Sequence, residues 1–297
     1  MSIVDDVETA LAGRDDVVAV GVDVEFLSAL LSARREDGGE GGEEGGRWRA
    51  ACPPGVVDDL GRTFVLGSAA AEACARGTLA LRTGTGPRPD RTLFASPGRV
   101  DAVVGPAGDR TLLADADPDR AAAAAEAVET RFETAEPASI GMPSRTRLLT
   151  AAREALDDRF ADDLAVVLST LGADPSALDR SAGIDDRTLL VALAARHDHL
   201  FSDVREWADA VGIAPKQTFS AARRDLEERG LVESIKVPMG VGRPNYRLRA
   251  VDETLYRVDA EAFLPAVREL FEAADGSGGS GVGGARVDDR PVWDRRR

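Results

Sequence analysis

The 297-residue sequence predicts an α/β N-terminal domain over residues 1–135 and a mostly α-helical, α+β domain over residues 181–252. Short apolar, β-branched runs alternate with helical patterns through the first part, which is typical of a small three-layer α/β domain. Beyond residue 144 the apolar residues recur three or four positions apart, as they do along amphipathic helices, until two strand-like segments follow near residue 231. A chain of this length can bury a separate core in each of two domains.

The N-terminal domain opens with a strand and then a helix. The run "VVAVGVD" (17–23) is strand-like, and the next apolar residues have helical spacing at Phe26, Leu27, Leu30 and Leu31. A second strand is expected at "RWRAAC" (47–52), with one or two helices after it. Four short strands are then expected in "GTLALRTG", "RTLFASPG", "RVDAVVGPAG" and "RTLLAD". Asp117 and Pro118 supply a cap and a first-turn proline, so a helix is predicted to begin there.

Two segments are predicted to be disordered. Residues 36–46 ("EDGGEGGEEGG") carry only negative charge. We expect a disordered acidic loop there and not a phosphate-binding loop, because carboxylates repel the anion. The Gly/Ser-rich tail 275–297 is expected to be disordered as well, after a C-terminal helix at 253–274.

The composition limits the classes of function. A net charge of -15 and a pI near 4.7 argue against a protein that coats nucleic acid or a membrane through its overall field, although one local basic face remains possible. Asp and Glu number 52, and only two of the 37 cationic residues are lysine. This balance is typical of a protein from an extreme halophile. A GC-rich genome explains the scarcity of lysine but not the acid excess.

The sequence also predicts the compartment. No apolar run approaches the roughly 18 residues of a membrane-spanning helix, so no membrane partner is expected. The acidic N-terminus lacks the basic start and apolar core of a signal peptide, which favours a cytoplasmic protein. Cys52 and Cys74 form no metal or redox motif, and each is expected to be a buried free thiol.

The second domain contains three predicted helices. The stretch "DDRTLLVALAARHDHLF" predicts the first, and "SDVREWADAVG" predicts the second, with Ser202 as its cap, Trp207 in its core and Gly212 at its end. The turn "IAP" leads to a third helix that begins at Pro215 and closes at Gly230. Its inward residues are Phe219, Ala222 and Leu226. Two helices joined by a short turn that contains glycine are the helix-turn-helix pattern.

Two strand-like segments, "LVESIKV" and "NYRLRA", flank the Gly/Pro turn "PMGVGRP". Helix, helix, turn, helix, strand, glycine-rich loop, strand is the winged-helix order. Over residues 186–250 the text "DLEERGLVES…GVGRPNYRL" resembles winged helix-turn-helix transcription regulators, in which Leu-Glu-x-x-Gly-Leu-Val links the recognition helix to the wing. The layout of the whole chain resembles a haloarchaeal regulator family of the TbsP type, whose members carry an α/β domain ahead of a C-terminal winged helix.

This resemblance implies a sequence-specific transcription regulator that binds double-stranded DNA. Its recognition helix would be about 215–229, in the major groove, and its wing about 236–247, on the backbone or minor groove. Gln217 is suited to adenine, and Lys216 or Arg223 to guanine. Ser220 and Arg224 are expected to hold phosphates. The expected wing contacts are Lys236, Arg243 and Arg247.

The local charge supports a nucleic-acid reader. Residues 212–250 carry eight cations and four anions, so the segment is +4 and the remainder of the chain is -19. The only two lysines, Lys216 and Lys236, both lie there. An alternative function stays open: a winged helix can be a protein–protein interaction module of the transcription apparatus. Loss of salt-dependent duplex binding on changing Arg223 and Arg224 separates the two.

A further amphipathic helix is predicted between the domains. Residues 136–180 are expected to hold a linker, at 136–144, and then a helix with an apolar stripe along about seven turns. Its members are Leu149, Ala152, Leu156, Phe160, Leu164, Val167 and Leu171. The stripe suits either a dimerisation helix or one side of the next domain's core. Because most DNA-reading modules of this size bind as pairs, a homodimer is favoured.

Other kinds of site are poorly supported. His197 and His199 make a weak metal-ligand set, and helix termination with surface exposure explains them better. No Ser/His/Asp or Cys/His grouping is visible, so neither an enzyme nor a cofactor is expected. The N-terminal domain is expected to sense a small ligand or to mediate assembly. A metabolite pocket would lie at the carboxyl ends of its strands, near Asp23 and the loop after Cys52.

Overall fold

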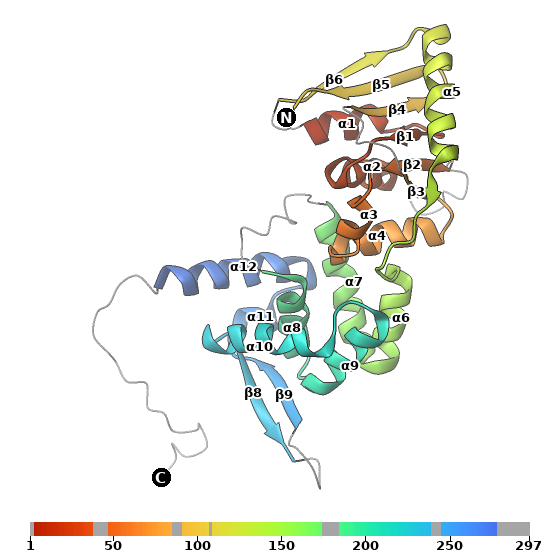
Figure 1. Ribbon diagram of the computed structural model, residues 1–297. Helices are drawn as coiled ribbons and strands as arrows, with labels where there is room; N and C mark the ends of the chain where they lie inside the picture. The colour runs from red at the N-terminus through yellow and green to blue at the C-terminus, as the bar shows by residue number, and fades with distance from the viewer. Residues whose placement is uncertain are drawn as a thin grey trace, which may run out of the picture.

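The computed structural model describes residues 3–37, 47–84, 91–106, 109–173, 184–238 and 245–277. An N-terminal α/β domain and a C-terminal helical domain with a two-stranded wing follow one another along the molecule, which confirms the predicted fold class (Figure 1). Among the described helices, none combines the length and apolar character needed to cross a membrane. Residues 38–46 of the expected acidic loop, and the tail from residue 278, lie outside the described residues.

A mixed sheet of seven strands forms the N-terminal domain. The strands are β1 (Val18–Val20), β2 (Trp48–Cys52), β3 (Leu79–Thr83), β4 (Thr92–Ser96), β5 (Arg99–Val104), β6 (Thr111–Asp115) and β7 (Glu136–Pro137). Their spatial order is β6-β5-β4-β1-β2-β3-β7. β1, β2 and β3 are parallel, and every other pairing is antiparallel. The segment 136–144 was expected to be wholly linker, but its first two residues extend the sheet, with Ala138 N donating to Leu81 O at 3.0 Å.

Helices cover both faces of this sheet, as a three-layer domain requires. They are α1 (Ile3–Leu11), α2 (Val24–Asp37), α3 (Val56–Leu60), α4 (Phe64–Ala75) and α5 (Pro118–Thr134). Alternate residues of β1 serve the two faces: Ala19 packs in the core with α1, α2 and α4, whereas Val18 and Val20 pack against α5. Helix α5 lies alone on its face (Figure 1). Asp117 caps it by accepting a hydrogen bond from Arg120 N, as predicted.

The single long helix predicted after the linker is wrong. The structure has two helices, α6 (Arg145–Ala155) and α7 (Asp158–Ala173), which break at Leu156 and pack on each other. The side chain of Asp157 separates the two helices, because its Oδ1 accepts a hydrogen bond from Phe160 N at 2.8 Å and so caps the start of α7. Phe160, Leu164 and Val167 are buried in the C-terminal core. The described stripe therefore forms part of that core.

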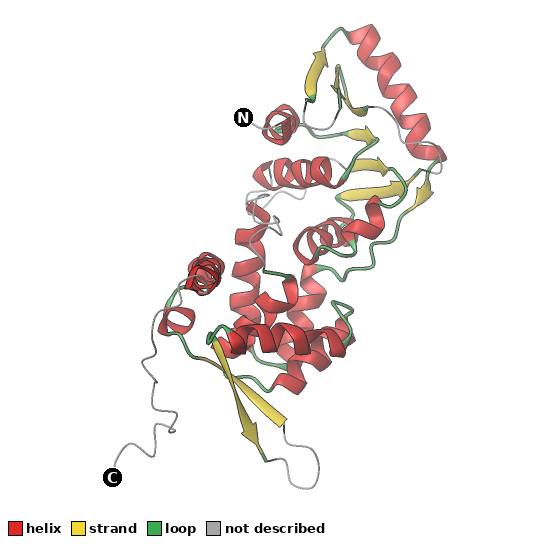
Figure 2. Cartoon of the chain, turned by 60° about the vertical axis from the view of Figure 1, so that its left-hand side comes forward, coloured by secondary structure: helices red, strands yellow, loops and turns green. Residues whose placement is uncertain are grey.

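The helix-turn-helix and its wing follow in the predicted order. The elements are α8 (Asp186–Arg196), α9 (Phe201–Val211), a short 3-10 helix (Lys216–Thr218), α10 (Phe219–Glu228), β8 (Val232–Val237) and β9 (Asn245–Ala250). Strands β8 and β9 pair antiparallel and project from the helices as a ribbon (Figure 2). Ser202 does not cap α9, which begins one residue earlier. Instead its Oγ accepts a hydrogen bond from Asn245 Nδ2 at the start of β9.

The C-terminal segment forms two helices where one was predicted, α11 (Glu253–Arg257) and α12 (Ala260–Ser277). The chain leaves the helical conformation at Val258, which is extended with φ -67° and ψ 150°. Phe263, Val267 and Phe271 are buried in the same core as α7 and α8. Helix α12 is therefore an integral part of the C-terminal domain.

Helix α4 joins the two domains. Its first residue, Phe64, lies in the C-terminal core, and Phe64 N donates to Asp186 Oδ2 at 3.0 Å. One turn before its end, Glu72 accepts hydrogen bonds from Thr146 N at 2.9 Å and Thr146 Oγ1 at 2.7 Å. Burial acts to raise the pKa of Glu72, but these bonds outweigh it and hold the pKa below its usual 4.5. Glu72 is thus a charged partner for the orphan amides at the start of α6.

Candidate nucleic-acid interface

The third helix of the helix-turn-helix is positioned by a tight turn and an apolar stripe. Gly212 ends α9 in the left-handed conformation, with φ 86°, as the sequence predicted. Three residues later Pro215 leads into the short 3-10 helix and then α10. Phe219, Ala222 and Leu226 are buried, which confirms the predicted inward face. The remaining sides of α10 are therefore left for solvent or for a partner.

One face of this helix, continued into the 3-10 helix before it, is exposed. Its members are Gln217, Ala221, Arg224 and Glu228, spaced three or four residues apart. Within the described part of the chain, Gln217 and Arg224 make no side-chain hydrogen bond or ion pair. Their donor and acceptor groups are therefore free to pair with a ligand. We call Gln217, Ala221 and Arg224 the reading face.

Lys216 and Ser220 lie at the side of the reading face and are half-buried. Lys216 Nζ is 3.9 Å from Glu206 Oε1 of α9, with 44 % of the lysine side chain exposed. An exposed pair at that distance is worth well under about 1 kcal/mol, so the ammonium can exchange this partner for a phosphate. Lys216 and Ser220 thus lie beside the reading face, on the surface of the third helix that was predicted from the sequence to contact DNA.

Arg223 has a different environment from the one expected. Its guanidinium lies 4.9 Å from the ring centroid of Phe201 and 4.8 Å from that of Tyr246, and only 21 % of its side chain is exposed. Nη1 donates to Ser234 Oγ at 3.4 Å, and Nε is 3.9 Å from Glu227. Arg223 therefore joins α9, α10 and both wing strands. Its guanidinium faces these neighbours and not the solvent side of the helix.

The wing carries two of the three cations predicted for it on described residues. Lys236 is exposed and makes no hydrogen bond or ion pair with any described residue. Arg247 is exposed, and its Nη1 donates to Asp198 O at 3.1 Å. Arg243 lies outside the described residues. The predicted cations are therefore divided between α10 and the wing, which pack together through Arg223.

Asp198 is a site residue that the sequence reasoning missed. It has φ 55°, an uncommon backbone conformation for a residue other than glycine. Its carbonyl accepts from Arg247, and its carboxylate lies 3.2 Å from Arg249 Nε. The turn between α8 and α9 therefore fixes two wing arginines. Asp adopts a positive φ more often than most residues do, but the sequence alone does not reveal which Asp has this conformation.

The two histidines, His197 and His199, were predicted to be exposed at the surface, and this prediction is wrong. Their side chains are 12 % and 13 % exposed, and both rings pack edge-on against Phe160 of α7. His197 Nε2 lies 3.0 Å from Asp163 Oδ2, and His199 Nε2 lies 3.4 Å from Asp157 Oδ2. Burial lowers the pKa of His199 below its ordinary 6.5. Among the described residues no group of His, Cys, Asp and Glu has the arrangement of a metal site.

Comparison with known protein families finds two matches, one for each domain of the chain. Residues 2–143 match the model described as "Transcriptional regulator TbsP-like, N-terminal", and residues 144–268 match "Transcriptional regulator TbsP-like, C-terminal HTH domain". The chain belongs to the TbsP-like family of transcriptional regulators. The two matches meet at Ser144, the residue that caps α6 by accepting from Arg147 N. The helix-turn-helix match therefore includes α6, α7 and the start of α12 together with the reading face.

Two solved structures show a distant likeness to this TbsP-like chain. One is the archaeal chromatin protein TrmBL2, at 13 % identity and a TM-score of 0.35, covering 44 % of this chain and 49 % of that one. Another is the Orc1 protein of Aeropyrum pernix in complex with DNA, at 13 % identity and a TM-score of 0.24, covering 90 % of this chain and 75 % of that one. The chain thus spans about half the length of TrmBL2. No curated protein matches it.

Proposed function

We propose that this chain is a sequence-specific regulator that binds double-stranded DNA through the reading face of α10. The observation that carries the proposal is that the polar side chains of this face have no hydrogen-bond or ion-pair partner among the described residues. Gln217 lies in the 3-10 helix that leads into α10, the third helix of a helix-turn-helix domain, and Arg224 lies on α10; both are exposed, and the described part of the chain supplies neither with a partner. The third helix of such a domain lies in the major groove, where its N-terminal residues contact base edges.

The chemistry of the reading face assigns a role to each side chain. The amide of Gln217 is suited to donate to N7 and accept from N6 of adenine. Arg224 is the arginine free to form the bidentate contact with guanine, or to hold a phosphate, since Arg223 is engaged by Phe201 and Tyr246. Lys216 and Ser220 then hold the backbone beside the helix. The methyl group of Ala221 can contact a thymine methyl.

The wing supplies contacts that do not read sequence. Lys236 and Arg247 lie on neighbouring strands, and Lys236 pairs in register with Tyr246. Exposed cations at this position suit the phosphate backbone, as proposed for Arg243 as well. Each such contact weakens as salt rises, with a slope of about -0.9 per phosphate on a log–log scale. For a protein proposed to work in concentrated salt, the contacts of the reading face carry more of the affinity.

Assembly and effector binding belong to the same proposal. We expect a homodimer that reads two half-sites, which sedimentation velocity would test. The stripe predicted for dimerisation is largely buried in the core of the C-terminal domain, so the dimer surface lies elsewhere. The N-terminal domain is proposed to bind a small effector.

Selection from fragmented genomic duplex tests the DNA-binding function. The wild type and a Gln217→Ala/Arg224→Ala double variant are compared in high potassium chloride, with Arg62→Gln as the matched control because Arg62 is 71 % exposed on the N-terminal domain. We expect the wild type and the control to enrich the same fragments and the double variant to enrich none. If no protein enriches any fragment while all three fold cooperatively, DNA reading is excluded and a protein partner becomes the function to test.

A further inference from the structure

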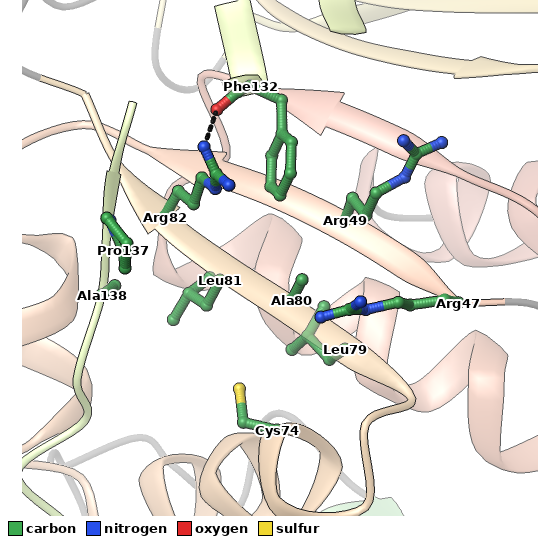
Figure 3. A pocket seen from close by; sticks show the side chains of 10 residues that line it. All are labelled: Arg47, Arg49, Cys74, Leu79, Ala80, Leu81, Arg82, Phe132, Pro137 and Ala138. Carbon is green, nitrogen blue, oxygen red and sulfur yellow. Dashed lines mark hydrogen bonds between the residues drawn. The ribbon is translucent and has the colours of Figure 1, made fainter. Parts of the chain in front are cut away.

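A cavity lies along the outer edge of β3 in the N-terminal domain. Its volume is about 340 Å³, within the range of small-molecule sites. Short β7 covers only the end of β3: it pairs with Arg82 and Thr83, and Ala138 N donates to Leu81 O, so among the described strands none pairs with this edge of β3 at residues 79 and 80. The cavity is bounded by side chains from β2 and the residue before it, from β3, α4 and α5, and from β7 and the residue after it (Figure 3).

Among the described residues, three arginines line this cavity and no carboxylate does. Arg49 is already paired, with Glu129 and with Asp16. Arg82 donates from Nη1 to the carbonyls of Phe132, Glu133 and Ala135, while its Nε and Nη2 have no partner among the described residues. The cavity therefore concentrates positive charge in an otherwise acidic chain, and carboxylates of the described residues neutralise only part of that charge.

Arg47 is the free cation of the set. It is exposed, one residue before β2, and makes no hydrogen bond or ion pair with any described residue. In Figure 3 its side chain extends toward the middle of the cavity, with the guanidinium beside Ala80 and Leu79. A guanidinium held there can form a bidentate pair with a carboxylate or a phosphate.

The rest of the lining is apolar. Phe132 forms one wall, stacked 4.7 Å from the guanidinium of Arg82, and Pro137 and Ala138 close the end. Cys74 lies on the other side of the strand, at the end of α4 (Figure 3). Burial raises the pKa of its thiol above the usual 9.0, so the group is uncharged at neutral pH and does not repel an anion. The cavity therefore suits a ligand with one charged end and an apolar body.

We propose that this cavity binds a small organic anion, a carboxylate or a phosphate ester with an apolar body, and that occupancy alters DNA binding. The anionic group pairs with Arg47 and the free donors of Arg82, while the body lies against Phe132 and Ala80. This is not the location expected from sequence. Asp23 there is engaged, since its Oδ1 accepts from Phe26 N at 3.0 Å and its Oδ2 pairs with Arg110 at 3.1 Å.

Two physical connections run from the cavity to the C-terminal domain. Pro137 and Ala138 begin the segment that leads directly into α6. Cys74 is two residues beyond Glu72, which binds Thr146 of α6, and the same helix inserts Phe64 into the C-terminal core. A ligand that moves the end of α4 or residues 137–138 therefore acts on the helices that support α8 to α10. This second half of the proposal rests on the proposed DNA-binding function.

Calorimetric titration of the full chain, without DNA, tests the binding half. The probes are benzoate and phenyl phosphate, with benzyl alcohol as their uncharged counterpart and inorganic phosphate as the head group alone. We expect at least one of the two aromatic anions to bind the wild type, and neither benzyl alcohol nor inorganic phosphate to bind comparably. Arg47→Gln should weaken binding at least tenfold, Arg47→Lys less, and the control Arg62→Gln not at all. The tighter aromatic anion identifies the head group as carboxylate or phosphate.

The contrary outcomes are distinct. If neither aromatic anion binds the wild type, or if Arg47→Gln binds as the wild type does, the proposed site is wrong. Duplex affinity is then measured with and without the saturating probe. A probe that binds but leaves duplex affinity unchanged refutes the coupling alone. A chain that binds the probe but no duplex refutes the proposed function and leaves the ligand site standing.

Discussion

Arg223 and Arg224 are neighbours with the same charge, and the structure predicts opposite consequences for their removal. The guanidinium of Arg223 lies between two rings, at 4.9 Å from Phe201 and 4.8 Å from Tyr246. Arg224 is exposed and contacts no partner that the described residues supply. Arg223→Ala should therefore reduce folding stability, whereas Arg224→Ala should reduce only binding.

The magnitude follows from the burial of the contacts. A cation–π contact is worth about 0.5–1 kcal/mol at exposed sites and about 2 kcal/mol when desolvated. With 21 % of the Arg223 side chain exposed, two such contacts sum to about 1–3 kcal/mol. The buried Nε of Arg223 has no hydrogen bond, which offsets part of this gain. We expect Arg223→Ala to lower the free energy of unfolding by about 1–2 kcal/mol and Arg224→Ala by less than about 0.5 kcal/mol.

Urea unfolding at fixed potassium chloride, followed by circular dichroism, measures both variants. The same preparations are then titrated with selected duplex. Arg223→Ala should shift the unfolding midpoint while Arg224→Ala should leave it in place and weaken duplex binding. Equal midpoints for the two variants, or a larger shift for Arg224→Ala, would refute the assignment of Arg223 as the residue that joins the wing to α9.

Three further predictions concern stability and pH. Glu72→Gln should weaken the α4–α6 contact by about 1 kcal/mol in urea unfolding, because a charged acceptor bonds more strongly than a neutral amide; an unchanged midpoint would contradict this. Asp185→Ala should cost about 1 kcal/mol, because Asp185 caps α8 by accepting from Thr188 N at 2.8 Å. A thermal melt that does not move would show the cap to be dispensable. The lowered pKa of His199 means that the unfolded chain binds the proton first, so stability should fall as the pH drops through 6.5; His199→Gln should flatten this decline in urea midpoints taken from pH 8 to pH 5.

Local signals in the sequence predicted the helix ends well. Gly212 closes α9 with the positive φ that glycine tolerates, and Asp117 with Pro118 starts α5. The helical stripe of Phe219, Ala222 and Leu226 correctly defined the buried face of α10. These features depend on a few adjacent residues, so a single sequence contains them.

The break between α6 and α7 was missed because the apolar spacing continues across it. Leu156 and Phe160 are four residues apart, yet Asp157 lies between them and caps the second helix. An Asp three residues before a buried aromatic residue is a start signal that was outweighed by the longer pattern. Periodicity alone does not distinguish one long helix from two that pack side by side.

The partners of Arg223 could not be predicted from α10 alone. Helical spacing places the residue beside the exposed face, which suggested a base contact. Phe201 comes from α9 and Tyr246 from β9, so the sandwich exists only after the wing folds back. The cavity at β3 depends likewise on elements distant in sequence, since Arg47, Cys74 and Phe132 meet only in the folded domain.

The central claim is that the exposed face of α10 reads DNA. The most direct measurement is a fluorescence anisotropy titration of an enriched duplex, at one fixed potassium chloride concentration. It compares the wild type, Gln217→Ala/Arg224→Ala and the control Arg62→Gln, after all three show the same thermal midpoint. The reading-face variant should lose at least tenfold in affinity, and most of the preference for the selected duplex over a scrambled one. Equal affinity and equal preference for all three proteins would contradict the assignment of α10 as the recognition helix.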